Sequence, residues 1–310
     1  MNTINTAIAL MIYNRPANTL KLINKLNKFN YNKLYVVADG PKTNNKDKLK
    51  VSKTRKLIEK NIKKKNFFKI YANENLGLKN RVVSGLDEIF KKEKKLIILE
   101  DDCIPSIEFF EFVEINLKNF ENNKKISSIL GTNYLTNLSF EKNFLFTKYF
   151  HPWGWATWKD RWIQKKFNFK FLLDKNHKKK LIKYLFSYRA YLYWTRRIKL
   201  IKKGKLNSWA NLWTYYNFIL KKKHIVPKYN LVDNIGINLD STNTQNLHYE
   251  YHGYSQLKKI KFKKYKIEKL SENNFDNMVE DVIFSKNFYN RVKWIIYKIN
   301  NKIKIIFNEK

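Results

Sequence analysis

The chain has 310 residues and carries 63 Lys or Arg against 26 Asp or Glu, which gives a formal net charge of +37. Hydrophobic residues make up 44% and aromatic residues 16% of the chain, a composition that is typical of a folded protein and not of a disordered one. Lysines occur in almost every segment. The charge is therefore as typical of a general compositional bias as of a nucleic-acid binder, a membrane-surface protein or an enzyme for polyanions. The single cysteine, Cys103, excludes an intramolecular disulfide and fits a reducing cytosol.

Nothing in the pattern of apolar residues predicts a signal peptide or a membrane span. The first apolar stretch, Ala7 to Tyr13, is as short as a strand and ends at Asn14-Arg15-Pro16. No run approaches the roughly 18 apolar residues that cross a bilayer. We therefore expect a cytoplasmic protein, either soluble or peripheral at the inner face of the cytoplasmic membrane.

Strand-like and helix-like segments alternate through the first half of the chain. Such alternation predicts an α/β fold with a mostly parallel central sheet, helices on both faces, and ligands at the carboxyl ends of the strands. The predicted strands are 7–13, 34–38, 67–71, 96–99 and 126–130, and the predicted helices are 20–26, 46–65, 78–92 and a further one that Pro105 and Ser106 open.

Three consecutive carboxylates, Glu100-Asp101-Asp102, follow the apolar strand Leu96 to Leu99. Like charges this close repel one another unless a cation neutralises them. Asp oxygens suit Mg²⁺ or Mn²⁺, ions that commonly link one or two carboxylates to diphosphate oxygens. The alternative is a helix N-terminus, where acidic side chains favour the helix dipole. The run of three after a buried strand favours the metal site.

Polar residues follow the other predicted strands as well. Asp39 is suited to a base or ribose edge, or simply to a tight turn. Arg15 either ends a strand or offers its fork of donors to a base carbonyl or a phosphate. Gly77 stands at a helix entry with Lys79 and Arg81 in the first turn, which suits an anionic ligand, although surface cations are often only solvated.

The order of these motifs resembles that of bacterial GT-A glycosyltransferases of the family-2-like type and, more distantly, is similar to the N-acetylglucosaminyltransferase I family. The resemblance covers roughly residues 6–245. The motifs that carry it are Tyr-Asn-Arg-Pro (13–16), Asp-Gly (39–40), Asn-Leu-Gly-Leu (75–78), Leu-Glu-Asp-Asp (99–102), Gly-Trp-Ala-Thr-Trp (154–158), Ser-Trp-Ala-Asn-Leu-Trp (208–213), Ile-Val-Pro-Lys (225–228) and Asn-Ile-Gly (234–236).

The resemblance implies a GT-A, Rossmann-like fold, a divalent cation (Mn²⁺ or Mg²⁺) and inverting transfer from a nucleotide-sugar donor. It implies that Asp102 binds the metal and that Asp101 faces the nucleotide ribose. The 154–158 segment would form the wall of the donor and acceptor site. The full set expected to contact the nucleotide sugar is Tyr13, Arg15, Asp39, Gly77, Lys79, Arg81, Asp101, Trp153, Gly154 and Trp155.

Two positions depart from the pattern of these relatives. In these relatives an acidic residue, the expected general base, follows the first Trp of the 208–213 motif. In this chain that position is occupied by Ala210. The usual Thr-His-Thr reads Thr242-Asn243-Thr244, so Asn243 is at best a weak metal ligand. Among the remaining acids, Asp160 and Asp233 lie nearest the recognised motifs and are the base candidates, although each also suits a structural role.

The predicted function is a hexosyl- or N-acetylhexosaminyltransferase that acts on a glycan or glycolipid acceptor in surface polysaccharide or lipopolysaccharide biosynthesis. The alternatives are an inactive or divergent GT-A protein and a sugar nucleotidyltransferase. The nucleotidyltransferase normally has a Gly-rich loop after its first strand, which Asn14-Arg15-Pro16 is not. No nucleic-acid partner is expected, because an acidic strand end repels phosphates unless a metal intervenes.

The predicted domain organisation is a catalytic domain at 1–250 and a basic, helical C-terminal extension at 251–310. The catalytic domain divides into a nucleotide-binding half (1–131) and an acceptor-binding half (132–250). Apolar residues recur at helical spacing with interleaved lysines in 288–307. This pattern predicts an amphipathic helix that lies on an anionic membrane surface or, equally, packs on the catalytic domain.

Overall fold

The computed structural model describes residues 3–62, 66–133, 143–163, 167–185, 188–236, 275–277 and 279–280. The chain divides into two compact units, Met1–Ser271 and Glu272–Lys310. Asn243 and the predicted membrane-surface helix 288–307 lie outside the described residues, so both stay predictions. Within the described part of the chain, no helix is long and apolar enough to cross a bilayer.

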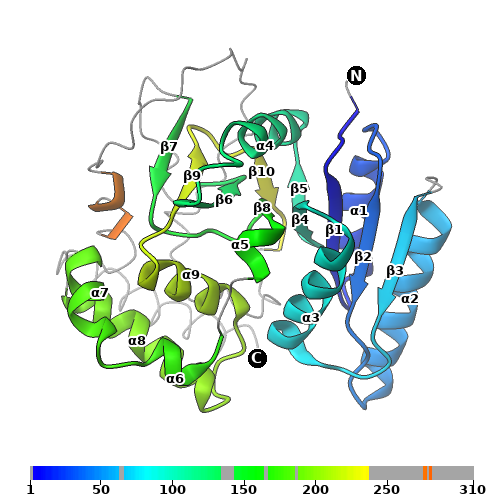
Figure 1. Ribbon diagram of the computed structural model, residues 1–310. Helices are drawn as coiled ribbons and strands as arrows, with labels where there is room; N and C mark the ends of the chain where they lie inside the picture. Colours follow the sequence, from blue (N-terminus) through cyan, green and yellow to red (C-terminus); the bar gives the residue numbers. More distant parts are fainter. Residues whose placement is uncertain are drawn as a thin grey trace, which may run out of the picture. The chain divides into compact units, whose positions relative to one another are not determined.

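The first half of unit Met1–Ser271 alternates strands and helices close to the predicted bounds. Unlike the prediction, Pro105 belongs to a short strand, and Ser106 alone caps the helix that follows by accepting a hydrogen bond from the Phe109 N–H at 3.3 Å. The elements are β1 (Ala7–Ile12), α1 (Pro16–Leu26), β2 (Leu34–Ala38), α2 (Asn45–Asn61), β3 (Phe67–Tyr71), α3 (Gly77–Lys92), β4 (Lys95–Glu100), β5 (Cys103–Pro105), α4 (Ile107–Asn119) and β6 (Ile126–Leu130) (Figure 1).

The second half adds more helices and completes the sheet. Its elements are β7 (Phe144–Thr147), β8 (Trp155–Trp158), α5 (Lys159–Ile163), α6 (Phe169–Leu172), α7 (His177–Leu185), α8 (Tyr188–Lys202), α9 (Trp209–Ile219), β9 (Lys223–Pro227) and β10 (Val232–Asn234). The sequence did not lead us to expect the four strands β7 to β10.

The central sheet has the strand order β3-β2-β1-β4-β8-β6-β9-β7, and β10 pairs separately with β5. Strands β3, β2, β1 and β4 are parallel, β8 runs against both of its neighbours, and β6 and β9 are parallel again. Six of the eight strands of this described sheet therefore run in the same direction. This architecture confirms the predicted α/β class with a mostly parallel sheet, and it brings the carboxyl ends of those six strands to one edge.

Helices cover both faces of the sheet. On one face, α1, α2 and α4 bury a cluster of aliphatic and aromatic side chains. In this cluster Phe29, just after α1, packs edge-on against Phe110 of α4, with 5.3 Å between the ring centres. On the other face, Trp155 of β8 stacks on Trp209 of α9 at 5.4 Å. Side chains alternate along each strand, so one strand contributes to the apolar layers on both faces of the sheet. On β2, Val36 and Ala38 point into the first cluster and Val37 points to the second face.

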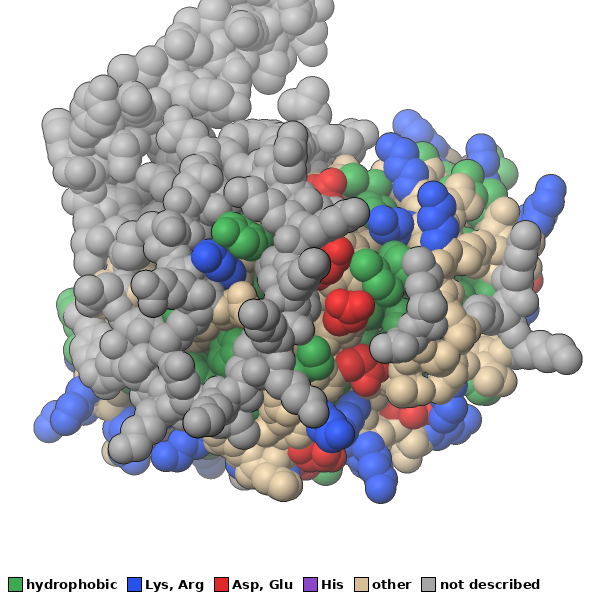
Figure 2. All heavy atoms as spheres, turned by 90° about the horizontal axis from the view of Figure 1, so that it is seen from above, with side chains coloured by type: hydrophobic (Ala, Val, Ile, Leu, Met, Phe, Trp, Pro, Cys, Tyr) green, Lys and Arg blue, Asp and Glu red, His purple; other side chains and the backbone are tan. Residues whose placement is uncertain are grey.

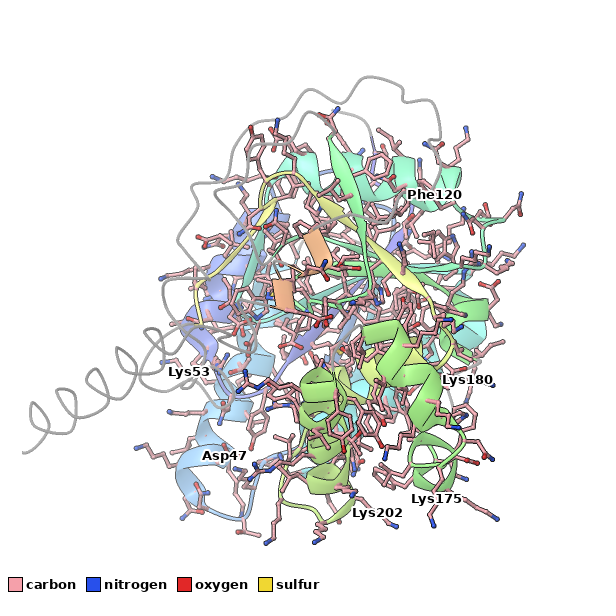
Figure 3. All side chains as sticks on the ribbon, turned by 90° about the vertical axis from the view of Figure 1, so that its left-hand side faces the viewer. Asp47, Lys53, Phe120, Lys175, Lys180 and Lys202 are labelled. Carbon is pink, nitrogen blue, oxygen red and sulfur yellow. The ribbon has the colours of Figure 1, made fainter. Side chains whose placement is uncertain are left out.

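Charge is unevenly distributed over unit Met1–Ser271. On the face seen from above, Asp and Glu side chains gather near the middle and Lys and Arg lie around them (Figure 2). In the side view, Lys175, Lys180 and Lys202 lie together near α7 and α8, apart from Lys53 on α2 (Figure 3). The lysine-rich composition therefore does not give a uniform surface.

Helix α3 approaches the sheet more closely than a side chain at Gly85 would allow. A Cβ atom at this position would lie 2.4 Å from Cγ1 of Val37 on β2. The contact places α3 directly over the parallel strands, which fixes the loop that leads into α3 at the carboxyl edge.

We predict that Gly85→Val lowers the free energy of unfolding by about 1–3 kcal/mol, because the added methyl groups overpack the interface between α3 and β2. The matched control is Ser84→Val, which puts the same side chain at the neighbouring exposed position. It changes helix propensity and removes the contacts of the Ser84 hydroxyl with Arg81, but it does not overpack the interface with β2. Urea denaturation measures both. Equal stability of the two variants would contradict the close packing.

Candidate functional site

The strand directions bring four segments to the same edge of the sheet. The loop after β1 supplies Arg15, the loop after β2 supplies Asp39, and β4 leads into Asp101 and Asp102. Because β8 is antiparallel to β4, Gly154, which precedes β8, lies at this edge too. These positions agree with the expectation that polar residues after separate parallel strands lie at one edge of the sheet.

A single guanidinium group holds the two aspartates of the acidic run. Nη1 of Arg15 lies 2.8 Å from Oδ2 of Asp102 and 3.3 Å from Oδ1 of Asp101. Burial alone would lower the pKa of Arg15, but the two carboxylates raise it above its ordinary value. The ion pair is partly buried, so removal of either partner would leave a charge without compensation.

The carboxylates still repel one another in this arrangement. Burial, followed by the charge of Asp102, raises the pKa of Asp101 to about 7, although Arg15 and the Tyr13 N–H lower it. Burial and both aspartates raise the pKa of Glu100 to about 8, and a hydrogen bond from the Trp209 indole opposes the shift. One guanidinium is therefore too little positive charge for this acidic run.

The segment that follows β10 closes one side of Asp102. Asn234 pairs with Cys103, and the Ile235 N–H donates to the carbonyl of Asp102 at 2.9 Å. A Cβ atom at Gly236 would lie only 2.0 Å from Oδ2 of Asp102. The glycine of the 234–236 motif is therefore required for space, a reason that the sequence alone did not provide.

The donor set at this edge fits a divalent cation that is shared with a ligand. Among the described residues, no three His, Cys, Asp or Glu side chains converge in the way that a site made only of protein ligands needs. Mg²⁺ and Mn²⁺ are, however, commonly bound by one or two carboxylates together with phosphate oxygens. Asp102 and Asp101 can supply those carboxylates, since both lie within reach of the same guanidinium nitrogen of Arg15.

Asp39 is occupied within the chain. One carboxylate oxygen accepts from the Gly40 and Leu76 N–H groups, both at 2.9 Å, and the other accepts from the Gly77 N–H at 3.0 Å and the Asn75 amide at 3.2 Å. A carboxylate offers about four acceptor positions, and all are filled. Asp39 therefore ties β2 to the start of α3, and a nucleotide base would have to displace one of these donors.

The start of α3 is likewise satisfied by the protein. Gly77 has a φ of +75°, which favours glycine, and the Lys79 N–H donates to the Asn207 side chain at 2.9 Å. The guanidinium of Arg81 is buried and donates to the carbonyl of Ile70 on β3. The N–H groups of Gly77 and Lys79 and the guanidinium of Arg81 thus donate to partners in the protein.

The Tyr13–Asn14 segment is anchored by Asp47, a residue that the sequence reading missed. The Tyr13 hydroxyl and the Asn14 amide each donate to the Asp47 carboxylate at 2.6 Å, and the Lys42 N–H donates at 2.7 Å. The signal in the sequence was the helix-capping spacing, because Asn44 caps α2 by accepting from the Asp47 N–H. Asp47 therefore fixes the segment that places Arg15.

The tryptophan-rich segment divides between core and edge. Trp155 is fully buried in β8 and packs among other tryptophans, so it does not line the site as the sequence predicted. Gly154 has a φ of +66°, and its carbonyl accepts from the Gly131 N–H at 2.7 Å. The Trp153 ring lies edge-on to buried His151 at 4.4 Å. Trp153 and Gly154 therefore stay candidates for a wall of the site.

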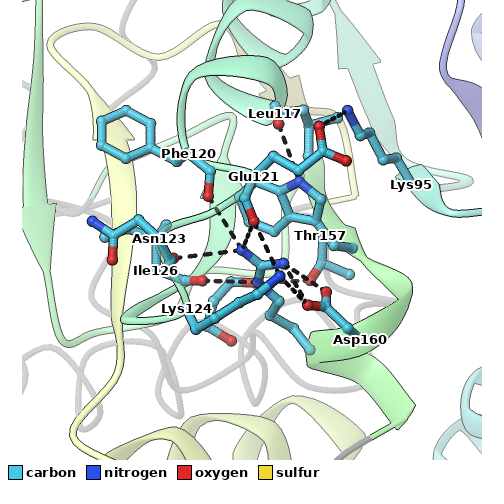
Figure 4. A network of polar contacts seen from close by, with 12 residues as sticks. Lys95, Leu117, Phe120, Glu121, Asn123, Lys124, Ile126, Thr157 and Asp160 are labelled. Carbon is cyan, nitrogen blue, oxygen red and sulfur yellow. Dashed lines mark hydrogen bonds and ion pairs between the residues drawn. The ribbon is translucent and has the colours of Figure 1, made fainter. Parts of the chain in front are cut away.

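Asp160 lies at the opposite edge of the sheet, which corrects its prediction as a base candidate. It follows β8, whose Trp158 pairs with Lys95 at the start of β4, roughly 17 Å of strand away from the acidic run. Its carboxylate binds Arg161 at 2.6 Å and Lys124 at 2.5 Å, in a network that ties α5 to the carbonyls after α4 (Figure 4). Asp160 is therefore paired with cations in a network far from the acidic run.

Asp233, the other base candidate, lies close to the acidic run. It pairs with Ile104 in the short ladder between β10 and β5, two residues along the chain from Asp102. Two residues of strand correspond to roughly 7 Å. Burial raises the pKa of Asp233 above its ordinary value. Of the two predicted candidates, only Asp233 is placed to act at this edge.

Comparisons with known proteins leave the family of this chain open. No protein-family model matches the sequence, and the search of curated proteins found no match. Among solved structures, the chain is weakly similar to a UDP-glucose pyrophosphorylase complexed with UDP-glucose, with a TM-score of 0.36 and 8% sequence identity, over 73% of this chain and 91% of that one.

We predict that Asp47→Ala lowers the free energy of unfolding by about 2 kcal/mol at neutral pH, because Tyr13, Asn14 and Lys42 lose a charged acceptor. Although burial opposes it, hydrogen bonding lowers the pKa of Asp47 in the folded protein. The stabilisation is therefore present above a pH of about 4, the ordinary Asp value, and is lost as the pH falls further.

Urea denaturation of wild type and variant between pH 7 and pH 3 measures this difference. The two proteins should converge in stability at the acid end of the range. A stability difference that stays constant across the range would show that the Asp47 charge is not what anchors the segment.

Proposed function

We propose that this chain is a glycosyltransferase that moves a sugar from a nucleoside-diphosphate donor to a glycan or glycolipid acceptor. The observation that supports the proposal is the acidic run at the carboxyl edge, where buried Asp101 and Asp102 face the single guanidinium of Arg15. A divalent cation with a diphosphate would relieve the repulsion between these carboxylates. In this proposal Asp102 holds Mn²⁺ or Mg²⁺, and Asp101 faces the ribose.

The bound cation would neutralise the negative charge that develops on the leaving diphosphate. Arg15 complements it, because its side chain lies at the open edge and its charge is fixed at all physiological pH values. When a diphosphate takes up negative charge beside Asp102, the guanidinium can shift from the carboxylates to a phosphate oxygen. Trp153 and Gly154 are proposed to form the acceptor side of the site.

The connection between β1 and α1 favours sugar transfer over nucleotidyl transfer. It consists of Tyr13, Asn14 and Arg15, contains no glycine, and is held down by Asp47. A loop that cradles a nucleoside triphosphate needs several free backbone N–H groups, which glycines make accessible. Such a loop does not fit in these three residues, which supports a diphosphate donor.

We propose Asp233 as the general base for the acceptor hydroxyl. Ala210 lies in the first turn of α9 directly after Trp209, which contacts Glu100, so a carboxylate expected at that position is replaced by a methyl group. Asp233 approaches the same edge from β10. Its raised pKa makes it a stronger proton acceptor than an ordinary surface aspartate.

The proposal predicts that Asp102→Asn abolishes release of nucleoside diphosphate from a panel of nucleotide sugars assayed with Mn²⁺. A loss of about a thousandfold is expected, because several kcal/mol of charge stabilisation disappear. Asp160→Asn is the matched control, since it makes the same replacement at the opposite edge, and it should keep the wild-type rate. An active Asp102→Asn protein would contradict the metal role.

The same assay distinguishes the two reaction types. Wild-type protein that forms a nucleoside triphosphate when pyrophosphate is supplied, and no diphosphate with any acceptor, would establish nucleotidyl transfer and overturn the proposal.

The base is tested separately with Asp233→Asn. We expect this variant to bind the donor with unchanged affinity and to lose turnover by about 10²–10⁴-fold, the usual contribution of a general base. The pH dependence of the rate should also change, because the titration of Asp233, whose pKa lies above the ordinary aspartate value, no longer contributes to it. Wild-type turnover in a folded Asp233→Asn protein would exclude Asp233 as the base.

A further inference from the structure

The helices α7 and α8 carry a strongly basic surface at one end of unit Met1–Ser271. Between Phe169 and Lys202 the sequence contains eleven Lys or Arg and a single acid, Asp174. Lys175, Lys180 and Lys202 lie on this part of the molecule (Figure 3). We name the exposed side chains of α7 and α8 the basic lobe. Its charge contrasts with the acidic side chains that gather on the face shown in Figure 2.

Helix α8 has one buried face and one exposed face. Ala190, Trp194, Ile198 and Ile201 are buried at helical spacing and pack toward the rest of the unit. The opposite face carries apolar side chains as well as cations, since Tyr188 is 53% exposed and Leu192 is 49% exposed. Arg196, Lys199 and Lys203 continue the same exposed line.

The apolar and basic residues form one continuous surface across the two helices. Nζ of Lys178, in the first turn of α7, lies 5.9 Å from the centre of the Tyr188 ring on α8. Lys179 and Lys180 are exposed next to it. Exposed apolar side chains surrounded by flexible cations are the arrangement by which a protein surface binds the headgroup region of a bilayer.

We propose that the basic lobe docks on an anionic lipid surface, with Tyr188 and Leu192 entering the headgroup layer and the surrounding Lys and Arg side chains facing the lipid phosphates. Charge complementarity selects an anionic partner. Exposed Leu192 beside Tyr188 favours a lipid surface, because the headgroup and acyl region accepts both side chains.

Helix α2 provides the internal comparison. It is also rich in exposed lysines, among them Lys48, Lys50 and Lys53, but it carries acids at Asp47 and Glu59. Its exposed large apolar side chain is Leu49 alone. If net positive charge were sufficient for lipid binding, α2 would contribute as much as the basic lobe.

The proposal is tested by co-sedimentation of the full-length protein with vesicles of equal parts phosphatidylglycerol and phosphatidylcholine, and with vesicles of phosphatidylcholine alone. The charge variant is Lys178→Glu/Lys179→Glu/Lys180→Glu. These three acids would lie in the first turn of α7, where they favour the helix dipole, so the fold is kept. The apolar variant is Tyr188→Ser/Leu192→Ser, and the control is Lys48→Glu/Lys50→Glu/Lys53→Glu on α2.

We expect wild type and the α2 control to bind the anionic vesicles equally, with binding that weakens as salt is added. The charge variant should bind about tenfold more weakly or worse, since each lysine near an anionic surface contributes measurably. The apolar variant should lose binding at all salt concentrations. No nucleotide or metal enters this experiment, so its outcome is independent of the proposed transfer activity.

Three results would overturn the proposal. Equal losses in the charge variant and the α2 control would show that only total charge matters. Wild-type vesicle binding by the apolar variant, together with loss of binding in the charge variant, would identify a general polyanion surface, such as one for nucleic acid. Binding that is the same on neutral and anionic vesicles would exclude the role of charge.

Discussion

The ion pair between Arg15 and the two aspartates after β4 is the interaction on which the carboxyl edge depends. Asp101 and Asp102 are buried beside Glu100, and burial together with the neighbouring charges raises the pKa of Asp101 and of Glu100. Arg15 is positioned for this by the parallel pairing of β1 with β4, which brings the ends of both strands together. The strand register therefore places the acidic run and the guanidinium of Arg15, which partly neutralises its charge, at the same edge.

Other loops at this edge are fixed by contacts within the chain. Asp39 holds the start of α3, Asn207 holds the next turn, and Asp47 holds the segment before α1. These hydrogen bonds fix the shape of the loops at this edge. Among the described residues here, Arg15, Asp101 and Asp102 form a cluster with two carboxylates on one guanidinium.

The sequence predicted the first half of the fold well because each element there has a local cause. Continuous apolar runs such as Leu96 to Leu99 form the central parallel strands, and the polar residues after them meet at one edge because the strands are parallel. The acidic run was found for the same reason. The strands β7 to β10 were missed, because short segments such as Trp155–Trp158 are defined by their partners across the sheet and not by a local pattern.

The contacts of the predicted site residues could not be read from the sequence either. Asp39 and Arg81 have the residue types that bind nucleotides, but the hydrogen bonds that they make within the chain depend on tertiary contacts with the loop before α3 and with β3. Asp160 lies six residues after Gly154, yet the direction of β8 carries it to the far edge of the sheet. Spacing along the chain gives the order of such residues, whereas strand direction decides which of them meet.

The end of β4 is proposed to bind a divalent cation together with a diphosphate. Electron paramagnetic resonance of Mn²⁺ detects such binding, because the signal of the free ion falls when the ion is bound. Mn²⁺ titrated into wild-type protein with UDP should show a bound ion that is absent without UDP and absent in Asp102→Asn. Binding of Mn²⁺ that is unchanged by the substitution, or no binding even with UDP present, would show that this edge is not the cation site.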